Sequence, residues 1–478
     1  MMLSRNVKVD EAKKYLRDKI KHFFLNDVHN ISFVEKQKII KLKVAIDAID
    51  PLIWLSQQQV EQKTYWSDRQ GDFTIAGLGV TDLVKGNEFI SYQDLFARLR
   101  KHLSSSSSQV HYYGGISFRN QEITTHPWQE FGNYYFLVPK FEVYTNESGT
   151  YFACNILLDS ETSYHLKLSQ LLIELNKITF ETVNWQTPIT KSFSRIDLPN
   201  KLGWYRNIKS ALASFAKGET EKIVLARQSN FTFLNPWQPE HLLSLLRKNN
   251  HQAFHFLFQP NAGKAFLGGT PERLYSRQER LIKTEAIAGT RGRGKSTPED
   301  QQLANDLLTS GKDMREHKLV VHSLNDALNK LCDFVEVSAK PNLLQLHQVQ
   351  HLHTSCYGFL QEEVEDGDII SQLHPTPAVG GYPKKQALEA IKKIEPFERG
   401  WYAAPVGWVG HDSAEFAVAI RSGLIVENKL TLFAGAGIVS GSKPESEWEE
   451  LENKIRNFRD IFGSVGKEAT HNNLVVAS

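Results

Sequence analysis

The spacing of apolar residues divides the chain into a helical start, a β-rich middle and an alternating second half. Residues 11–50 carry an apolar stripe that includes Tyr15, Ile20, Phe23 and Phe24, which predicts helix. From 51 to 200 the chain has short β-rich runs bounded by Gly, Asn and Ser turns, among them DFTIAGLGV, VHYYGGISF and NYYFLVPKFEVY. Two further segments in this region have helical periodicity, DLFARLRKHL and YHLKLSQLLIELNKI.

The second half of the chain mixes strand-like and helix-like segments. Strands are predicted for KIVLARQ, AFHFLFQ, KAFLGG, RLIKTEAIA, QHLHTSCYGFL, PVGWVG, EFAVAIRSGLIV and KLTLFAGAG. Helices are predicted for PEDQQLANDLLTS, MREHKLVVHSLNDALNKL and KKQALEAIKKI. Because predicted strands often follow one another directly, as hairpins do, the pattern favours an α+β fold with large antiparallel sheets.

Composition narrows the class of protein. The chain has 478 residues, of which 41% are hydrophobic and 23% charged, as in an ordinary globular protein with a sizeable core. A net charge of +2 gives no electrostatic reason to expect nucleic acid or a membrane surface, and no apolar run approaches membrane-spanning length. The three cysteines form neither a metal motif nor an even disulfide set, so we expect a cytoplasmic protein.

No linker forces a division of the chain into separate domains. We expect residues 1–200 to form an N-terminal part of the fold, 201–465 a catalytic region and 466–478 a loose tail, all within one compact domain.

Two pairs of acidic residues carry the first chemical signal. Asp313 and Glu316 are three residues apart, as are Glu447 and Glu450, and on a helix this spacing places both carboxylates on one face. Two such faces suit a hard divalent cation such as Mg²⁺, which prefers oxygen ligands. The nearby glycine-rich stretch FAGAGIVSGS offers backbone N–H groups to a carboxylate. The pattern indicates a metal-assisted site for a small anionic acid, although such pairs also occur on solvated helix surfaces.

The segment GTRGRGKS at 289–296 matches the phosphate-binding loop pattern and follows a predicted strand, so a nucleotide-binding protein is an alternative. Against it, Pro298 lacks the N–H that such a loop needs and suits a helix that starts there, with Thr297 as its N-cap.

A second alternative is zinc binding by His347, His351 and His353, with Cys356 beyond them. However, VQHLHTSCYGF alternates as a strand does. This reading places His351 and His353 on one face and His347 in the preceding turn, which disfavours a shared metal.

Ten blocks between residues 222 and 454 together resemble the chorismate-utilising enzymes, which are the isochorismate, salicylate, anthranilate and aminodeoxychorismate synthases. The blocks are KIVLAR, GGTPERL, TEAIAGTRGRG, KDMREHKLV, QHLHT, LHPTPAVGGYP, EPFERGWYAAPVGW, AIRSG, AGAGIV and EWEELENK. The N-terminal half is similar to the menaquinone-pathway type of isochorismate synthase in PLIWLSQQ, TYWSDRQGDFTIAGLG, YYGGISF and FLVPKFEV. The resemblance implies the chorismate-binding (aminodeoxychorismate synthase-like) fold, with large antiparallel β-sheets packed face to face and helices outside.

The same resemblance implies roles for individual residues. Lys222 matches the lysine that activates water, and Glu272 matches the general acid that protonates the departing C4 hydroxyl. Ala288 stands where aminodeoxychorismate synthases have an attacking lysine, so that route is closed to this chain.

Metal and substrate positions carry over in the same way. Glu316 and Glu450 match the Mg²⁺ carboxylates, with Asp313 and Glu447 in support. The matching substrate positions are Gly289, Thr290, His351, Thr376, Tyr402, Arg421, Gly435, Gly437 and Lys454.

The resulting hypothesis is a Mg²⁺-dependent isochorismate synthase of the menaquinone or phylloquinone type. A salicylate synthase, which adds pyruvate elimination in the same pocket, is the alternative within the family, and the lysine does not separate the two. We expect chorismate as the substrate, no amidotransferase subunit, and a monomer or homodimer.

Overall fold

The computed structural model describes residues 7–28, 37–104, 109–120, 126–159, 163–181, 193–250, 252–345 and 349–462. His347 and the predicted tail at 466–478 lie outside these ranges.

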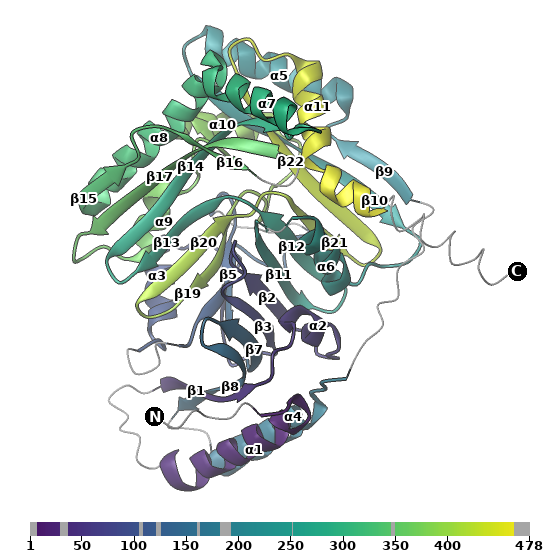
Figure 1. Ribbon diagram of the computed structural model, residues 1–478, viewed down its shortest axis with the longest axis vertical. Coiled ribbons are helices and arrows are strands. Elements are labelled where there is room, and N and C mark those ends of the chain that lie inside the picture. The colour runs from purple at the N-terminus through teal and green to yellow at the C-terminus, as the bar shows by residue number, and fades with distance from the viewer. Residues whose placement is uncertain are drawn as a thin grey trace, which may run out of the picture.

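Within the described residues, twelve strands form a first antiparallel sheet (Figure 1). Its main path runs β1-β8-β7-β3-β2-β11-β12-β21-β22-β10-β18, and β9 pairs with β10 beside it. The strands are β1 (Gln37–Ile46), β2 (Lys63–Ser67), β3 (Thr74–Leu78), β7 (Phe141–Asn146), β8 (Gly149–Asp159), β9 (Phe193–Leu198), β10 (Lys222–Phe233), β11 (Phe254–Asn261), β12 (Lys264–Thr270), β18 (Gly381–Tyr382), β21 (Ser422–Val426) and β22 (Lys429–Val439).

A second antiparallel sheet contains ten strands of the described part of the chain, in the order β15-β17-β14-β13-β20-β19-β5-β6-β4, with β16 beside β17. These strands are β4 (Asp82–Gly86), β5 (Tyr112–Ile116), β6 (Tyr134–Val138), β13 (Arg273–Gln278), β14 (Leu281–Gly292), β15 (Cys332–Val337), β16 (Asn342–Gln345), β17 (Val349–Leu360), β19 (Pro405–Val409) and β20 (Ser413–Val418). Both halves of the chain therefore contribute strands to both sheets.

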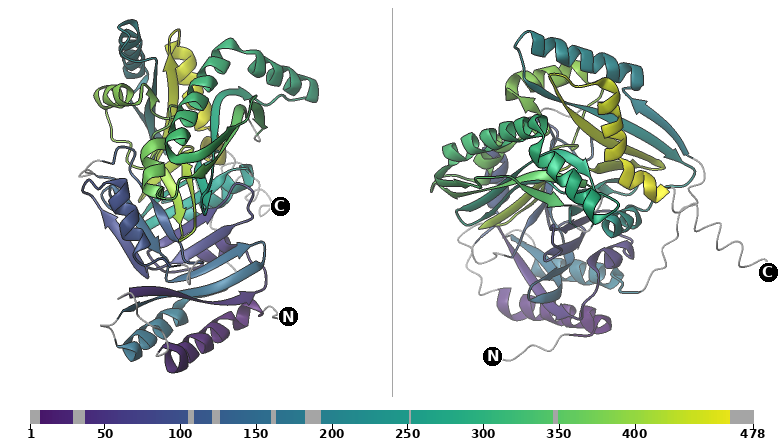
Figure 2. Two further views of the ribbon diagram at one scale, coloured as in Figure 1. Left: turned by 90° about the vertical axis from the view of Figure 1, so that its left-hand side faces the viewer. Right: turned by 45° about the horizontal axis from the view of Figure 1, so that its top comes forward.

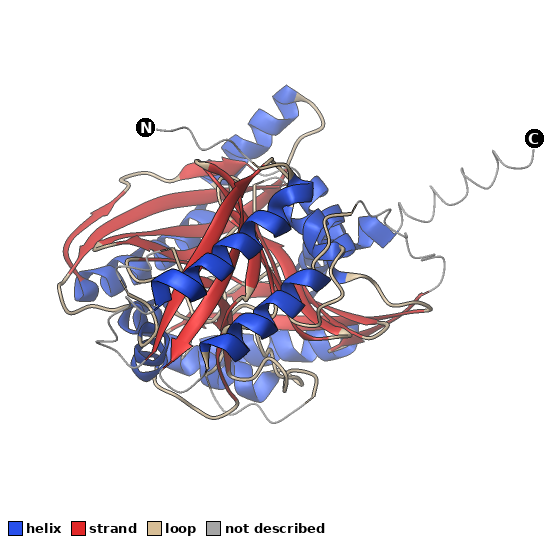
Figure 3. Cartoon of the chain, turned by 90° about the horizontal axis from the view of Figure 1, so that it is seen from below, coloured by secondary structure: helices blue, strands red, loops and turns tan. Residues whose placement is uncertain are grey.

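Helices cover the outside of the two sheets. They are α1 (Ala12–His22), α2 (Pro51–Ser56), α3 (Tyr92–Arg100), α4 (Tyr164–Lys177), α5 (Lys201–Ala216), α6 (Pro239–Asn249), α7 (Thr297–Thr309), α8 (Gly311–Leu331), α9 (Asp366–Leu373), α10 (Lys384–Ile394) and α11 (Pro444–Lys454). At one end of the molecule α1 and α4 lie side by side (Figures 1 and 3). At the other end, α5, α7, α8, α10 and α11 surround the ends of β10, β14 and β22 (Figures 1 and 2).

The sheets share one apolar core. Trp401, which precedes β19 of the second sheet, packs against Phe258 and Phe266 of the first sheet, with ring centroids 5.7 and 6.2 Å apart. Its indole N–H donates to the Gly132 carbonyl, so the buried ring has no unpaired polar atom. Among the described residues, no helix is both long and apolar enough to cross a membrane.

The predicted α+β fold with large antiparallel sheets is confirmed, but the N-terminal helix was predicted too long. Helix α1 ends at His22, and residues 37–46 form β1, which pairs with β8 along its whole length. The reason is visible in KLKVAI, where polar and apolar residues first alternate with the period of two that a half-buried strand requires. Tyr15, assigned to the apolar stripe, is 47% exposed, whereas Ile20, Phe23 and Phe24 are buried.

Candidate active site

A cavity of about 220 Å³ opens where β10, β14, β17 and β22 meet α11 and the first turns of α8. Thirteen of the site residues predicted from sequence line it: Glu272, Gly289, Thr290, Asp313, Glu316, His351, Tyr402, Arg421, Gly435, Gly437, Glu447, Glu450 and Lys454. Lys222 and Thr376 are absent from the lining. Lys222 bonds directly to Glu316, and Thr376 precedes the lining residues Ala378 and Val379.

Lys222 is the first residue of β10, and the strand pairing with β22 fixes its position. Its side chain is only 1% exposed, and Nζ donates a hydrogen bond of 2.8 Å to Oε1 of Glu316 on α8. Burial alone raises the pKa of Glu316, but Lys222, followed by Lys454 and Lys312, outweighs it and leaves the pKa below the ordinary glutamate value. The candidate base and a candidate metal ligand are therefore in direct contact.

Gly437 provides the room for this contact. A Cβ at this position comes within 3.0 Å of Cε of Lys222 and 3.3 Å of Oε1 of Glu316, and the buried lysine has little space to retreat. We expect Gly437→Ala to lower turnover at least about tenfold, because displaced groups lose the geometry that catalysis requires. Steady-state kinetics check this, with circular dichroism to confirm folding. Gly292→Ala on β14 is the matched control, since a Cβ there meets nothing within 4 Å, and it should retain the parent rate.

Glu272 lies between β12 and β13, where its carbonyl accepts from the Val418 amide. The residue is 6% exposed. Burial, followed by the negative charge of Glu285, raises the pKa of Glu272 to about 7, although Lys222, Lys454 and Arg69 pull it down. A carboxyl group in this state holds a proton near neutral pH and can deliver it to a leaving group.

The second acidic pair is on α11. Pro444 begins this helix, and Glu447 lies on its buried face together with Leu451. Burial raises the pKa of Glu447, and Glu450 adds to this effect while a hydrogen bond from Ser442 opposes it. Glu450 accepts from Lys454 Nζ at 2.6 Å.

The carboxylates that line this cavity fit a hard divalent cation. Glu316 comes from α8 and both Glu447 and Glu450 from α11, so the donors are all oxygen atoms on two helices that line one cavity. Asp313, one turn before Glu316, accepts from Arg291 at 2.7 Å. Among the residues that the structure describes, no three histidine, cysteine or acidic side chains are grouped so that they alone could hold a metal ion. A cation held here therefore relies on substrate or water oxygens for its remaining ligands.

The other side of the lining suits an anionic ligand. Arg421 donates to the Lys454 carbonyl at 3.2 Å, and Lys454 Nζ donates to the Gly435 carbonyl at 2.7 Å. These two cations line the cavity beside Tyr402, whose ring stacks on Phe433 with a centroid distance of 5.2 Å. Two positive side chains next to an aromatic wall match a small ring that carries carboxylates.

His351 presents a neutral ring to the cavity. Its Nδ1 lies 2.9 Å from the Thr290 hydroxyl and 3.3 Å from the Gly289 carbonyl. Burial, reinforced by Arg421, lowers the pKa of His351 to about 3. Its Nε2 and the buried hydroxyl of Thr376 have no hydrogen-bond partner within the described part of the chain. A polar ligand can satisfy such atoms.

In the loop that matches the phosphate-binding pattern, backbone amides donate to carboxylates of the helix that follows it. The amide of Gly294 donates to Asp300 and that of Lys295 to Glu299, at 2.8 and 2.7 Å. Helix α7 begins at Thr297 with Ser296 as its N-cap, so the predicted cap at Thr297 was wrong by one residue. These amides are already paired, which argues against a phosphate site.

The strand interpretation of the histidine segment is confirmed. His351 and His353 both lie on β17, where His351 contacts Thr290 and His353 contacts Glu285. Cys356 is a buried free thiol on the same strand. The two histidines have separate partners, which is inconsistent with a shared zinc ion.

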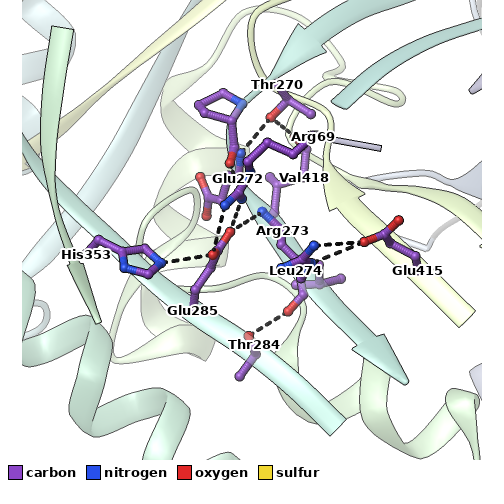
Figure 4. Close-up of polar contacts among 11 residues, drawn as sticks. Arg69, Thr270, Glu272, Arg273, Leu274, Thr284, Glu285, His353, Glu415 and Val418 are labelled. Atoms are coloured by element: carbon purple, nitrogen blue, oxygen red, sulfur yellow. Dashed lines mark hydrogen bonds and ion pairs between the residues drawn. The ribbon is translucent and has the colours of Figure 1, made fainter. Parts of the chain in front are cut away.

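Sequence reasoning missed a buried network next to Glu272, which Figure 4 shows. Glu285 on β14 accepts from Arg69 and lies 3.0 Å from Nε2 of His353 on β17. Arg69 lies in the turn between β2 and β3, more than two hundred residues before its partner. Nothing in its surroundings, SDRQGD, distinguishes it from a surface arginine.

The chain is similar to known proteins along most of its length. Residues 26–463 match the family described as chorismate binding enzyme. The isochorismate synthase MenF of Bacillus subtilis is 32% identical over 457 residues, which cover 92% of this chain and 96% of the relative. Isochorismate synthase 2 of Arabidopsis thaliana, a chloroplastic protein, is 32% identical over 88% of this chain and 80% of its own length.

Solved structures of related proteins have the same fold. The structure of MenF, the menaquinone-specific isochorismate synthase from Escherichia coli, superposes with a TM-score of 0.82 at 29% identity, covering 94% of this chain and 100% of that one. Anthranilate synthase component I from Streptococcus pneumoniae shares the fold, with a TM-score of 0.64 at 20% identity over 90% and 93% of the two chains. The chain belongs to the chorismate binding enzyme family.

Proposed function

We propose that this chain is an isochorismate synthase, which isomerises chorismate by adding water at C2 and releasing the hydroxyl from C4. The observation that carries the proposal is the arrangement of two buried groups around one cavity. Lys222 reaches it through Glu316, and Glu272 lines it with a pKa of about 7. The relatives that match most of the chain are named isochorismate synthases.

Lys222 acts as the base and Glu272 as the acid. As the oxygen of water bonds to C2, a proton passes from that water to Nζ of Lys222, which must be in its neutral amine form to accept it. Glu272 gives its proton to the C4 hydroxyl, which leaves as water while the ring double bonds shift. Substrate and product are isomers with similar bonding, so the reaction is reversible.

Arg421 and Lys454 hold the carboxylates of the substrate, with Tyr402 and His351 shaping the pocket around the ring. Glu316 and Glu450 would hold Mg²⁺, and Asp313 and Glu447 would support them. When bound, Mg²⁺ supplies positive charge that offsets a substrate carboxylate and the charge that develops as the hydroxyl leaves. Glu447 and Glu450, whose like charges act on each other, are a donor pair that a cation stabilises.

Incubation of the protein with chorismate and MgCl₂, followed by chromatographic separation of the products, tests the assignment. We expect isochorismate together with remaining chorismate. Salicylate and pyruvate as end products identify the alternative within the family, and unchanged chorismate contradicts the proposal.

Chelation should stop the reaction. We expect EDTA to abolish turnover and excess MgCl₂ to restore it, because without a cation Glu316 and Glu450 repel the anionic substrate. Glu450→Gln should lose most of the activity with the fold intact. Glu449→Gln, its exposed neighbour on α11, is the matched control and should keep the parent rate. Undiminished turnover in EDTA refutes the metal assignment.

The proposed nucleophile is water, so the chain works without an amidotransferase subunit, as a monomer or homodimer. Its product is a precursor for menaquinone or phylloquinone synthesis. A reducing cytoplasm is the proposed location, in keeping with free thiols at Cys154, Cys332 and Cys356.

A further inference from the structure

Glu285 is a buried carboxylate that the proposed reaction does not use. Its side chain is 1% exposed, and donors surround both oxygens. Arg69 donates to both, the Arg273 amide donates to Oε1 at 3.0 Å, and Nε2 of His353 lies 3.0 Å from Oε2 (Figure 4). Burial alone raises the pKa of Glu285, but His353, Arg69 and Arg273 outweigh it and hold the pKa well below its usual range. Glu285 therefore carries a full negative charge at neutral pH.

The same network forms hydrogen bonds to the backbone on both sides of Glu272. Arg69 donates to the carbonyl of Pro271, the residue before Glu272, while Glu285 accepts from the amide of Arg273, the residue after it. In Figure 4 the carboxylate of Glu285 lies at the centre of these contacts, next to Glu272. The position of the acid is thus tied to the position of a second, permanently charged carboxylate.

We propose that Glu285 is a positioning residue for catalysis, a fixed negative charge that Arg69 and His353 hold beside Glu272 to keep Glu272 in its acid form. The inference rests on the proposed role of Glu272 as proton donor. It gives the N-terminal half of the chain a part in the reaction, because Arg69 comes from the turn between β2 and β3.

Other charges around Glu272 act in the opposite direction. Lys222 faces it from β10, Lys454 from α11 and Arg69 from the N-terminal half, and each favours loss of its proton. Tyr402 also faces Glu272, with a pKa that burial raises well above the neutral range, so it stays uncharged. Burial and Glu285 are the two influences that keep the proton in place.

Glu285→Gln tests the proposal through the pH dependence of kcat/KM. Removal of the negative charge makes Glu272 easier to ionise, so the alkaline limb of the profile should move to lower pH by about one unit or more. Glu415→Gln is the matched control. Glu415 is also buried and pairs with Arg273 in the same region, but its carboxylate makes no contact with Glu285 or Glu272 in Figure 4. The alkaline limb of the Glu415→Gln profile should stay at the same pH as in the parent protein.

Arg69→Met provides a second test, of opposite sign. It removes a positive charge from Glu272 while His353 and the Arg273 amide still hold Glu285 ionised, so the limb should move to higher pH. If Glu285→Gln does not fold, as judged by circular dichroism, the double variant Arg69→Met/Glu285→Gln removes both partners of the ion pair, and its limb should lie at lower pH than that of Arg69→Met. An unmoved limb in Glu285→Gln, or the same limb in Arg69→Met with and without Glu285→Gln, overturns the proposal.

Infrared spectroscopy supplies a readout that does not depend on turnover. The carbonyl stretch of protonated Glu272, assigned by its loss in Glu272→Gln, should disappear at lower pH in Glu285→Gln than in the parent protein. An identical midpoint in both proteins overturns the inference. A parent protein that leaves chorismate unchanged refutes the proposed function instead, so the two failures are distinguishable.

Discussion

Replacing Lys222 with alanine is expected to lower the rate of chorismate isomerisation by about 10²–10⁴-fold, the usual contribution of a positioned base. Water is a poor nucleophile at neutral pH, and Lys222 is the buried amine whose Nζ reaches the site through Glu316. The variant should still bind chorismate, because Arg421 and Lys454 remain in the cavity lining. Saturation kinetics and isothermal titration calorimetry measure the two effects separately.

Lys429→Ala is the matched control for this experiment. Lys429 is also the first residue of a strand, β22, but it is exposed. The control should keep the parent rate. If folded Lys222→Ala retains more than about a tenth of the parent rate at saturating substrate, Lys222 is not the base.

Glu272→Gln is expected to be comparably damaging. Without a proton donor the C4 oxygen must leave as hydroxide, which is a far poorer leaving group than water. The pKa of Glu272 is about 7, so the parent kcat/KM should fall as pH rises through neutrality, because the acid form disappears there. The residual activity of the variant should lack this limb. Stopped-time assays across a pH series, with product separation by chromatography, measure both.

Glu336→Gln controls for the loss of a glutamate from a strand, since Glu336 on β15 is exposed and is not among the residues that line the cavity. Its rate and pH profile should match those of the parent. An alkaline limb that persists unchanged in Glu272→Gln assigns the titration to another group and refutes the acid assignment.

The elements with strong periodicity were predictable from sequence alone. In α8, apolar and small residues recur on one face, and the structure buries Val320, Leu324, Leu328 and Leu331 on that side. Strands such as β6 and β11 were visible because aromatic and β-branched residues crowd into them. The segment that became β1 was misassigned because its alternation begins only at Lys41 and its strand character depends on pairing with β8.

Some residues of the candidate site were also predictable from local sequence patterns, and others were not. The paired carboxylates on α8 and α11 and the glycines of β22 were visible because their spacing is local. Arg69 was not visible, and His353 was considered only as a zinc ligand, because their roles arise only when the fold brings them to Glu285. Thr376, expected in the pocket, lies in the loop between α9 and β18. No local sequence pattern predicts where the backbone of that loop places its buried hydroxyl.

The interleaving of strands from both halves has a consequence for synthesis on the ribosome. In the first sheet β2 pairs with β11, which begins at Phe254, past the midpoint of the chain, and in the second sheet β5 pairs with β19. Until those partners emerge, the nascent N-terminal half carries unpaired strand edges, which are templates for contact with other chains. Such distant pairings also make closure of the sheets slow. We therefore expect the nascent chain to need protection from such contacts for longer than a protein whose strands pair in order of synthesis.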